Sequence, residues 1–391
     1  MVYLDHAATT PVKPEALQAA WPWLTSEFGN PSSRHELGLR AADALANARI
    51  QVANWLGCQP GEIVFTSGAS ESNNLAIKGI ALGLLAPQPE RKHIISARTE
   101  HESVLQSLDY LERIHGFEIE YLAANRAGQL TAEAVAAAIR PNTALITLMT
   151  ANNEIGTVHP IAEIAQVARQ ANVAFHTDAV QAAGWLDINV AQTQVSALSL
   201  SGHKIGAPKG VGIAYLSNRL QVEPLIHGGG QEHEMRSGTE NVAWAVAFAS
   251  ALNALPNTPD GIDIGSNRVA DLRDALVAGV LENVKIAQLT GAPLDEPRQP
   301  AIASFVFESI NSETLLIELE NEGVLCSSGS ACAAGKDDPS HVLLALGYEP
   351  DLARTSVRLS LGRESTTAEV ETALNAIVTA CRKITELEGN R

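Results

Sequence analysis

The sequence contains little of the material from which disulfide frameworks and zinc sites are built. Among its 391 residues there are 4 cysteines, and no two of them form a C-x-x-C pair. Thiols this few and this scattered argue against a disulfide framework and against a structural zinc site. A reducing cytoplasm is therefore the expected location. The four cysteines are Cys58, Cys326, Cys332 and Cys381.

Other signals are missing as well. The first residues, MVYLDHAATTP, lack a basic stretch followed by an apolar one, so we expect no signal peptide. No apolar run approaches the length needed to cross a bilayer. The formal net charge is −17, with acidic residues spread along the chain, which argues against a nucleic-acid partner bound by charge. We find neither an internal repeat nor a low-complexity segment.

The sequence does contain a regular alternation of strand-like and helix-like segments. Its hydrophobic fraction of 46% suits a globular protein, and its length allows two domains with a large core. Short apolar runs separated by amphipathic helices predict a mostly parallel sheet covered on both faces. The predicted strands occupy residues 62–66, 93–97, 144–150, 173–177, 195–200 and 212–216.

The last third of the chain reads differently. After a long helical stretch that begins at VAWAVAFASALNAL, strands such as AIASFVF and SVRLSLG mix with helices. This mixture predicts a smaller α+β domain near which the first residues pack. We therefore expect a large domain over residues 16–255 and a small domain formed by residues 1–15 and 256–391.

Polar side chains follow the predicted strands at the points where the strands end. Because ligands of open α/β sheets bind outside the carboxyl ends of the strands, these residues are expected to meet in one site. They are Ser70, His101, Asn153, Asp178, Gln181, Ser201, His203 and Lys204.

Lys204 carries the strongest chemical signal, because an ammonium between two buried strands is costly unless something uses it. The helix opened by SGAS offers free backbone amides for a phosphate. Asp178 suits a protonated ring nitrogen, His101 an aromatic ring, and Lys204 a Schiff base with an aldehyde. Taken singly, Asp178 would more often be an acidic turn residue, His101 a neighbour of a helix cap, and Lys204 an ordinary surface lysine. Together they describe pyridoxal phosphate.

The motifs in the sequence also resemble those of a known protein family. The chain resembles the cysteine desulfurases of the NifS/IscS type, which belong to the class-V aminotransferases. The resemblance implies a pyridoxal-phosphate-dependent, aspartate-aminotransferase-like α/β fold (fold type I) with a mainly parallel seven-stranded sheet and a smaller α+β domain. It covers nearly the whole chain in the same order, through YLDHAATTPV, GNPSSRH, EIVFTSGASESNNLAIKG, TEHESV, NNEIGTVHPI, HTDAVQAAG, SGHKIGAPKGVG, HGGGQEHEMRSGTEN, SSGSAC and SVRLSLGR.

The resemblance implies a role for each matched residue around the cofactor ring. Lys204 forms the Schiff base and then removes the α-proton of the substrate, while Asp178 pairs with the ring nitrogen. Gln181 hydrogen-bonds the ring oxygen, and His101 stacks on the ring and relays protons. Asn153 lies beside the cofactor and the substrate.

The remaining implied roles concern the phosphate, the substrate and the sulfur. Arg358 binds the substrate carboxylate, for which a planar fork is suited. Cys332 takes the sulfur as a persulfide, because forming an S–S bond requires a thiolate. The phosphate is held by Ala69, Ser70, Ser201 and His203, and by Thr239 of the other subunit.

The implied activity is conversion of L-cysteine to L-alanine by a cytoplasmic homodimer. The sulfur would go to an iron–sulfur scaffold or another acceptor protein, and to tRNA thiolation. No metal site is predicted apart from transient contact of Cys332 with an iron–sulfur cluster. The alternatives are another pyridoxal-phosphate reaction, such as transamination or selenocysteine lysis, and a non-catalytic platform that binds scaffold proteins.

Several details depart from the family or remain open. The segment from Ala333 to Asp338 follows the family only loosely, and the sequence ends with CRKITELEGNR, where some relatives continue into a scaffold-binding tail. Cys326 is interpreted as a small buried residue at a strand end rather than a redox thiol. Because it is rich in small and polar residues, we expect the segment from Ser327 to His341 to be mobile.

Overall fold

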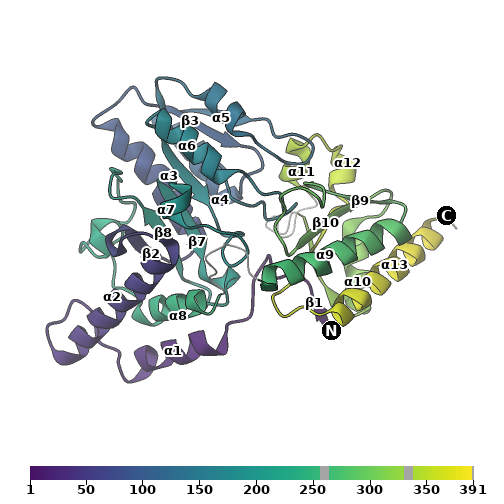
Figure 1. The fold of residues 1–391 in the computed structure, drawn as a ribbon, viewed down its shortest axis with the longest axis horizontal. Helices are drawn as coiled ribbons and strands as arrows, with labels where there is room; N and C mark the ends of the chain where they lie inside the picture. Colours follow the sequence, from purple (N-terminus) through teal and green to yellow (C-terminus); the bar gives the residue numbers. More distant parts are fainter. Residues whose placement is uncertain (256–263, 330–337, 390–391) are drawn as a thin grey trace.

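The computed structural model describes residues 1–255, 264–329 and 338–389. A large sheet with helices on both faces occupies one side of the molecule, and a smaller α+β body occupies the other (Figure 1). The large sheet has seven strands, and only β8 runs against its neighbours, so the predicted mainly parallel sheet is confirmed. In spatial order the strands are β2 (Ile63–Thr66), β8 (Gly212–Leu216), β7 (Ala197–Ser201), β6 (Ala174–Asp178), β5 (Thr143–Thr147), β3 (His93–Ala97) and β4 (Glu118–Leu122).

Two apolar cores lie on the two faces of this sheet. One face packs against α3 (Ala69–Leu85) and α4 (Glu102–His115). The other packs against the remaining helices of this part of the chain, whose apolar side chains form a larger cluster. These helices are α1 (Pro14–Thr25), α2 (Glu36–Leu56), α5 (Ala132–Ala138), α6 (Ile161–Gln170), α7 (Val190–Thr193) and α8 (Val242–Asn253). The two-sided cover explains why the inner strands β6 and β7 are buried along nearly their whole length.

The edge strand β4 is the one strand of this sheet that the sequence analysis missed. It reads EIEYL, and its side chains are half-buried or exposed, whereas β3 beside it is buried throughout. An edge strand needs no continuous apolar run because one side of it faces solvent. The sequence of β4 therefore lacks the apolar run by which the other strands of this sheet were predicted.

The smaller body has its own sheet and core. Its sheet is antiparallel, in the order β12 (Ser327–Ser328), β13 (Val357–Ser360), β10 (Ile302–Phe307) and β9 (Ala287–Leu289). The N-terminal strand β1 (Val2–Tyr3) pairs in this body with β11 (Val324–Leu325). Figure 1 labels β1, in purple, within the smaller body. Its helices are α9 (Ile264–Asn283), α10 (Ser312–Asn321), α11 (His341–Ala345), α12 (Pro350–Ala353) and α13 (Thr367–Gly389).

The chain then crosses from β1 to the large sheet. The Asp5 backbone bridges to Ser360, the Thr10 N–H donates to the His203 carbonyl at 2.9 Å, and the Lys13 N–H donates to the Gly206 carbonyl at 2.8 Å. The first residues thus connect β13 of the small body to the turn after β7. No helix among the described residues is long and apolar enough to cross a membrane.

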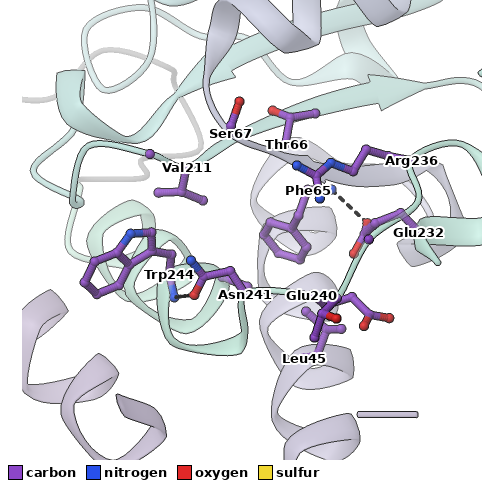
Figure 2. Close-up of a pocket in the computed structure, with 14 residues that line it drawn as sticks. Leu45, Phe65, Thr66, Ser67, Val211, Glu232, Arg236, Glu240, Asn241 and Trp244 are labelled. Carbon is purple, nitrogen blue, oxygen red and sulfur yellow. Dashed lines mark hydrogen bonds between the residues drawn. The ribbon is translucent and has the colours of Figure 1, made fainter. Parts of the chain in front are cut away.

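A buried ion pair fastens the loop after β8 to the large sheet. Glu232 receives two hydrogen bonds of 2.7 Å from the Arg49 guanidinium. Its carboxylate also accepts the Phe65 N–H at 2.8 Å, and Figure 2 shows Glu232 beside Phe65. Both charged side chains are almost fully buried. Residues 232–234 all have positive φ values, from 48° to 67°, which non-glycine residues adopt at a cost. The ion pair holds this strained turn in place.

We predict that Glu232→Ala lowers the free energy of unfolding by about 3–5 kcal/mol, because it leaves a buried guanidinium without its counter-charge. Urea denaturation of the variant and of wild type measures the difference. Asp109→Ala serves as the control, because it removes an exposed ion pair with Arg113 and should change stability little. Equal losses in the two variants would contradict the prediction.

Candidate active site

One cavity of about 670 Å³ gathers nearly all the residues that the sequence singled out. It lies at the carboxyl ends of β6 and β7, where ligands of open α/β sheets bind. The predicted residues that line it are Ala69, Ser70, His101, Asn153, Asp178, Gln181, Ser201, His203, Lys204 and Arg358.

Lys204 ends the 3₁₀ turn η2 (Gly202–Lys204) that follows β7 directly. Its Nζ donates hydrogen bonds to the carbonyl of Ala7 and, at 2.7 Å, to that of Ala8. The Ala7 carbonyl also accepts a hydrogen bond of 3.0 Å from Gln181 Nε2. The sequence analysis assigned no role to Ala7 and Ala8, because a contact made by a backbone carbonyl cannot be predicted from the identity of the side chain.

Asp178 is the last residue of β6 and is buried. Its Oδ1 accepts the Val180 N–H at 3.0 Å, and its Oδ2 accepts Asn73 Nδ2–H at 2.7 Å. Two donors hold a buried carboxylate in one orientation and offset part of its desolvation cost. Asn73 lies in α3 and was not among the predicted site residues.

His101 is the N-cap of α4, and its Nδ1 accepts the Ser103 N–H at 3.1 Å. His101 therefore has both of the roles considered from the sequence, because the same ring caps a helix and lines the cavity. Two carboxyl groups close to this region, Glu100 and Glu154, were missed by the sequence analysis. Burial raises the pKa of both, and well above the usual range for Glu100.

The opposite end of the cavity is suited to an anion. The N-terminus of α3, at Ala69, opens into it beside Ser201 and His203. Gly212 permits this closeness, because a Cβ there would lie 2.7 Å from the Gly68 backbone. Burial, together with the nearby ammonium groups of Lys204 and Lys209, lowers the pKa of His203 to about 4. His203 is therefore a neutral imidazole at neutral pH.

Arg358, in β13, brings the small body to the cavity. Its Nη2 pairs with Asp5 Oδ1 at 3.0 Å, and its Nη1 donates to the Asn153 carbonyl at 2.9 Å. Its Nε is buried and has no hydrogen-bond partner among the described residues. A buried N–H without an acceptor is costly, and the guanidinium that carries it lines the cavity as a fixed positive charge suited to an anionic ligand.

Two predicted residues lie elsewhere. Thr239 lines a second, smaller cavity of about 300 Å³, drawn in Figure 2, which shares Ser67 and Gly210 with the first. Cys332 lies outside the described residues, as does most of the segment 327–341 that was expected to be mobile. Ser327 and Ser328 pair with β13, with Ser327 opposite Arg358.

The other candidate thiol in this region, Cys326, is a poor nucleophile. Burial raises its pKa to about 12, with the Asp5 carboxylate adding to the effect. A thiol of this kind stays protonated at neutral pH, and only the thiolate attacks sulfur. The interpretation of Cys326 as a small packed residue agrees with this environment.

Comparisons with known proteins agree with one another. The aminotransferase class-V family model matches residues 2–373. A cysteine desulfurase IscS from Dictyoglomus turgidum is 40% identical over 98% of this chain and 95% of its own length. An IscS-like cysteine desulfurase from Mycobacterium tuberculosis is 42% identical over 96% of this chain and 95% of its own length.

Comparison with solved structures agrees with these sequence similarities. A structure described as a NifS-like protein superposes with a TM-score of 0.88 at 33% identity, over 97% of this chain and 98% of its own. A structure of SspA in complex with cysteine has a TM-score of 0.81 at 38% identity, over 94% of this chain and all of that one.

The chain belongs to the aminotransferase class-V family, whose fold it shares. Within that family it is a cysteine desulfurase of the NifS/IscS type and uses pyridoxal phosphate. The alternatives of a transaminase, a selenocysteine lyase or a non-catalytic platform are not favoured by these relatives.

The residues present fit the cofactor. An amine, a buried carboxylate and an anion-binding helix terminus line one cavity, and these three groups suit an aldehyde, a protonated ring nitrogen and a phosphate. Among the described residues, no group of His, Cys, Asp and Glu is placed to hold a metal ion.

Two histidines, His176 buried and His203 half-buried, predict how stability depends on pH. The pKa of His176 is lowered to about 3 by burial, and that of His203 to about 4. As the pH falls below about 6.5, the unfolded chain binds protons that the folded chain does not, so stability falls on acidification. His176 alone contributes a slope of up to about 1.4 kcal/mol per pH unit in this window.

Urea unfolding of the protein between about pH 7 and about pH 5 measures this slope. His176→Gln should flatten it by about one proton, whatever the variant does to stability at neutral pH. An unchanged slope in the variant would show that His176 is protonated in the folded chain.

Proposed function

We propose that the cavity divides the desulfurase reaction between a cofactor end and a substrate end, with Lys204 between them. The observation that supports this most is that one cavity is lined by Lys204, the buried Asp178 and Arg358. Pyridoxal phosphate, when bound, supplies an aldehyde for amines and a ring that accepts the electron pair of a broken bond.

The protein's own groups fix where that chemistry happens. Asp178, held by two donors, is set to keep a ring nitrogen protonated. Gln181 lies beside it for the ring oxygen, and His101 lies in the same cavity for the ring face. Neutral His203 donates to the phosphate together with the first residues of α3, Ala69 and Ser70, and with Ser201.

At the substrate end, the Arg358 guanidinium binds the carboxylate of L-cysteine, near Asn153. Lys204 then takes the α-proton of the substrate. The Cys332 thiolate attacks the substrate sulfur, so an S–S bond forms while the C–S bond breaks. The electron pair of the C–S bond stays with the carbon, and protonation gives L-alanine. The sulfur remains on Cys332 as a persulfide.

Beyond the chemistry, we propose a cytoplasmic homodimer that passes sulfur to an iron–sulfur scaffold, to tRNA thiolation or to another acceptor. The separate position of Thr239 supports a role across a subunit interface. Large apolar side chains on and after α1 are exposed, including Trp21 at 62% and Phe28 at 70%, as expected of a surface that a partner covers. The separate core of each sheet supports the division into residues 16–255 and residues 1–15 with 256–391.

The first prediction concerns Lys204. Lys204→Ala should abolish turnover, because it removes both the covalent attachment point and the base. Borohydride reduction followed by peptide mass analysis should label wild type at residue 204 and leave the variant unlabelled. Normal labelling of the variant would show that another lysine carries the cofactor.

The second prediction concerns Cys332. Cys332→Ser should keep the cofactor and bind L-cysteine, yet form no persulfide, because a hydroxyl is a far poorer nucleophile toward sulfur than a thiolate. The mass of the peptide containing residue 332 is measured after incubation with cysteine. Cys326→Ser is the control and should retain activity. Sulfur on Cys326 with activity surviving in Cys332→Ser would reverse the assignment.

The third prediction concerns assembly. Light scattering should give a mass twice that of one chain, because Thr239 lines the second cavity rather than the first and is proposed to reach the phosphate of the other subunit. Thr239→Val should weaken cofactor binding. A monomer with full activity would contradict the proposed dimer.

A further inference from the structure

Asn73 lies between two of the residues assigned to the cofactor. Its side-chain amide donates one hydrogen bond to Asp178 Oδ2 at 2.7 Å and another to Ser103 Oγ at 2.9 Å. Only 1% of its surface is exposed. A single buried amide on α3 thus joins the end of β6 to the first turn of α4.

The orientation of this amide is fixed by its surroundings. If the amide were reversed, its oxygen would face the Asp178 carboxylate, and two acceptors would oppose each other. In the orientation seen, Asn73 Oδ1 is buried and has no hydrogen-bond partner among the described residues. An unsatisfied buried oxygen costs roughly 1–3 kcal/mol. Because Asn73 carries this cost, its presence is better explained by a role in the site than by a contribution to stability.

Ser103 continues the connection to His101. The Oγ atom of Ser103 lies 2.8 Å from His101 Nδ1, and the Ser103 N–H donates to the same Nδ1 at 3.1 Å. Because Asn73 donates to the serine oxygen, the serine's own hydrogen is directed toward the imidazole. Two donors therefore converge on Nδ1, and the neutral ring carries its proton on Nε2.

We propose that Asn73 and Ser103 are positioning residues that join Asp178 to His101 and act on both. The relay holds the Asp178 carboxylate in the rotamer that meets the ring nitrogen, and it holds His101 as the Nε2–H tautomer. Proton transfers by His101 then pass through Nε2, because Nδ1 is committed as an acceptor. The inference rests on the roles proposed above for Asp178 and His101.

The tautomer is tested by NMR of the full-length protein with isotope-labelled histidine, before and after cofactor is added. The signal of His101 is identified as the one lost in His101→Gln. Wild type should show the Nε2–H form. Ser103→Ala should lower the fraction of that form, because it removes the hydroxyl donor at Nδ1. Ser107→Ala is the matched control, since Ser107 lies one turn further along α4 and donates to the Ser103 carbonyl instead.

The Asp178 side is tested with Asn73→Leu, which keeps the side-chain volume and removes both donors. Its holoenzyme should show an altered cofactor absorption spectrum and a kcat/KM lower by about 10-fold or more, as for other residues that orient a site group. Asn74→Leu is the control on the same helix, because Asn74 is half-buried and its amide donates to the Ser70 carbonyl rather than to Asp178 or Ser103. Asn74→Leu should retain the wild-type spectrum.

Three results would overturn the relay: an Nδ1–H tautomer in wild type, an unchanged tautomer in Ser103→Ala, or a wild-type spectrum in Asn73→Leu. A merely structural role would lower the melting temperature of these variants without moving the tautomer or the spectrum. Because the tautomer is also read without cofactor, it does not depend on Lys204 or Cys332. Failure of those two assignments with the tautomer as expected would therefore count against the proposed function alone.

Discussion

The buried Asp178 carboxylate is the constraint on which the rest of the site depends. A negative charge at the end of an inner strand is costly unless donors surround it, and here Val180 and Asn73 supply them. The parallel pairing of β6 with β7 then brings the turn that holds Lys204 to the same edge of the sheet. The pairing of β6 with β7 thus brings the Asp178 carboxylate and the Lys204 amine into a single cavity.

The N-terminal segment completes this arrangement from the other body. Its carbonyls at Ala7 and Ala8 hold the Lys204 ammonium, while Asp5 pairs with Arg358. The amine and the arginine proposed for the substrate are therefore positioned by residues close together in the chain. Backbone hydrogen bonds hold this short extended stretch between the two sheets, from β1 to the turn after β7.

Much of the fold and of the cavity could be predicted, because both follow from buried strands with polar residues at their ends. The inner strands were found by their apolar runs, and the residues after β6 and β7 line the cavity as expected. The edge strand β4 was missed because one side of it faces solvent. Asn73 and the Ala7 and Ala8 carbonyls were missed because their importance comes from the partners they meet, which no local pattern records. The position of Thr239 in a separate cavity likewise depends on tertiary packing.

The central claim is that this cavity binds pyridoxal phosphate with its ring nitrogen on Asp178 and its phosphate at the start of α3. A crystal structure of the protein with pyridoxal phosphate and L-cysteine tests it most directly. The account predicts a ring nitrogen within hydrogen-bonding distance of Asp178, a phosphate contacting Ser70 and His203, and a substrate carboxylate on Arg358. A ring bound in the opposite direction, or a substrate carboxylate held away from Arg358, would contradict it.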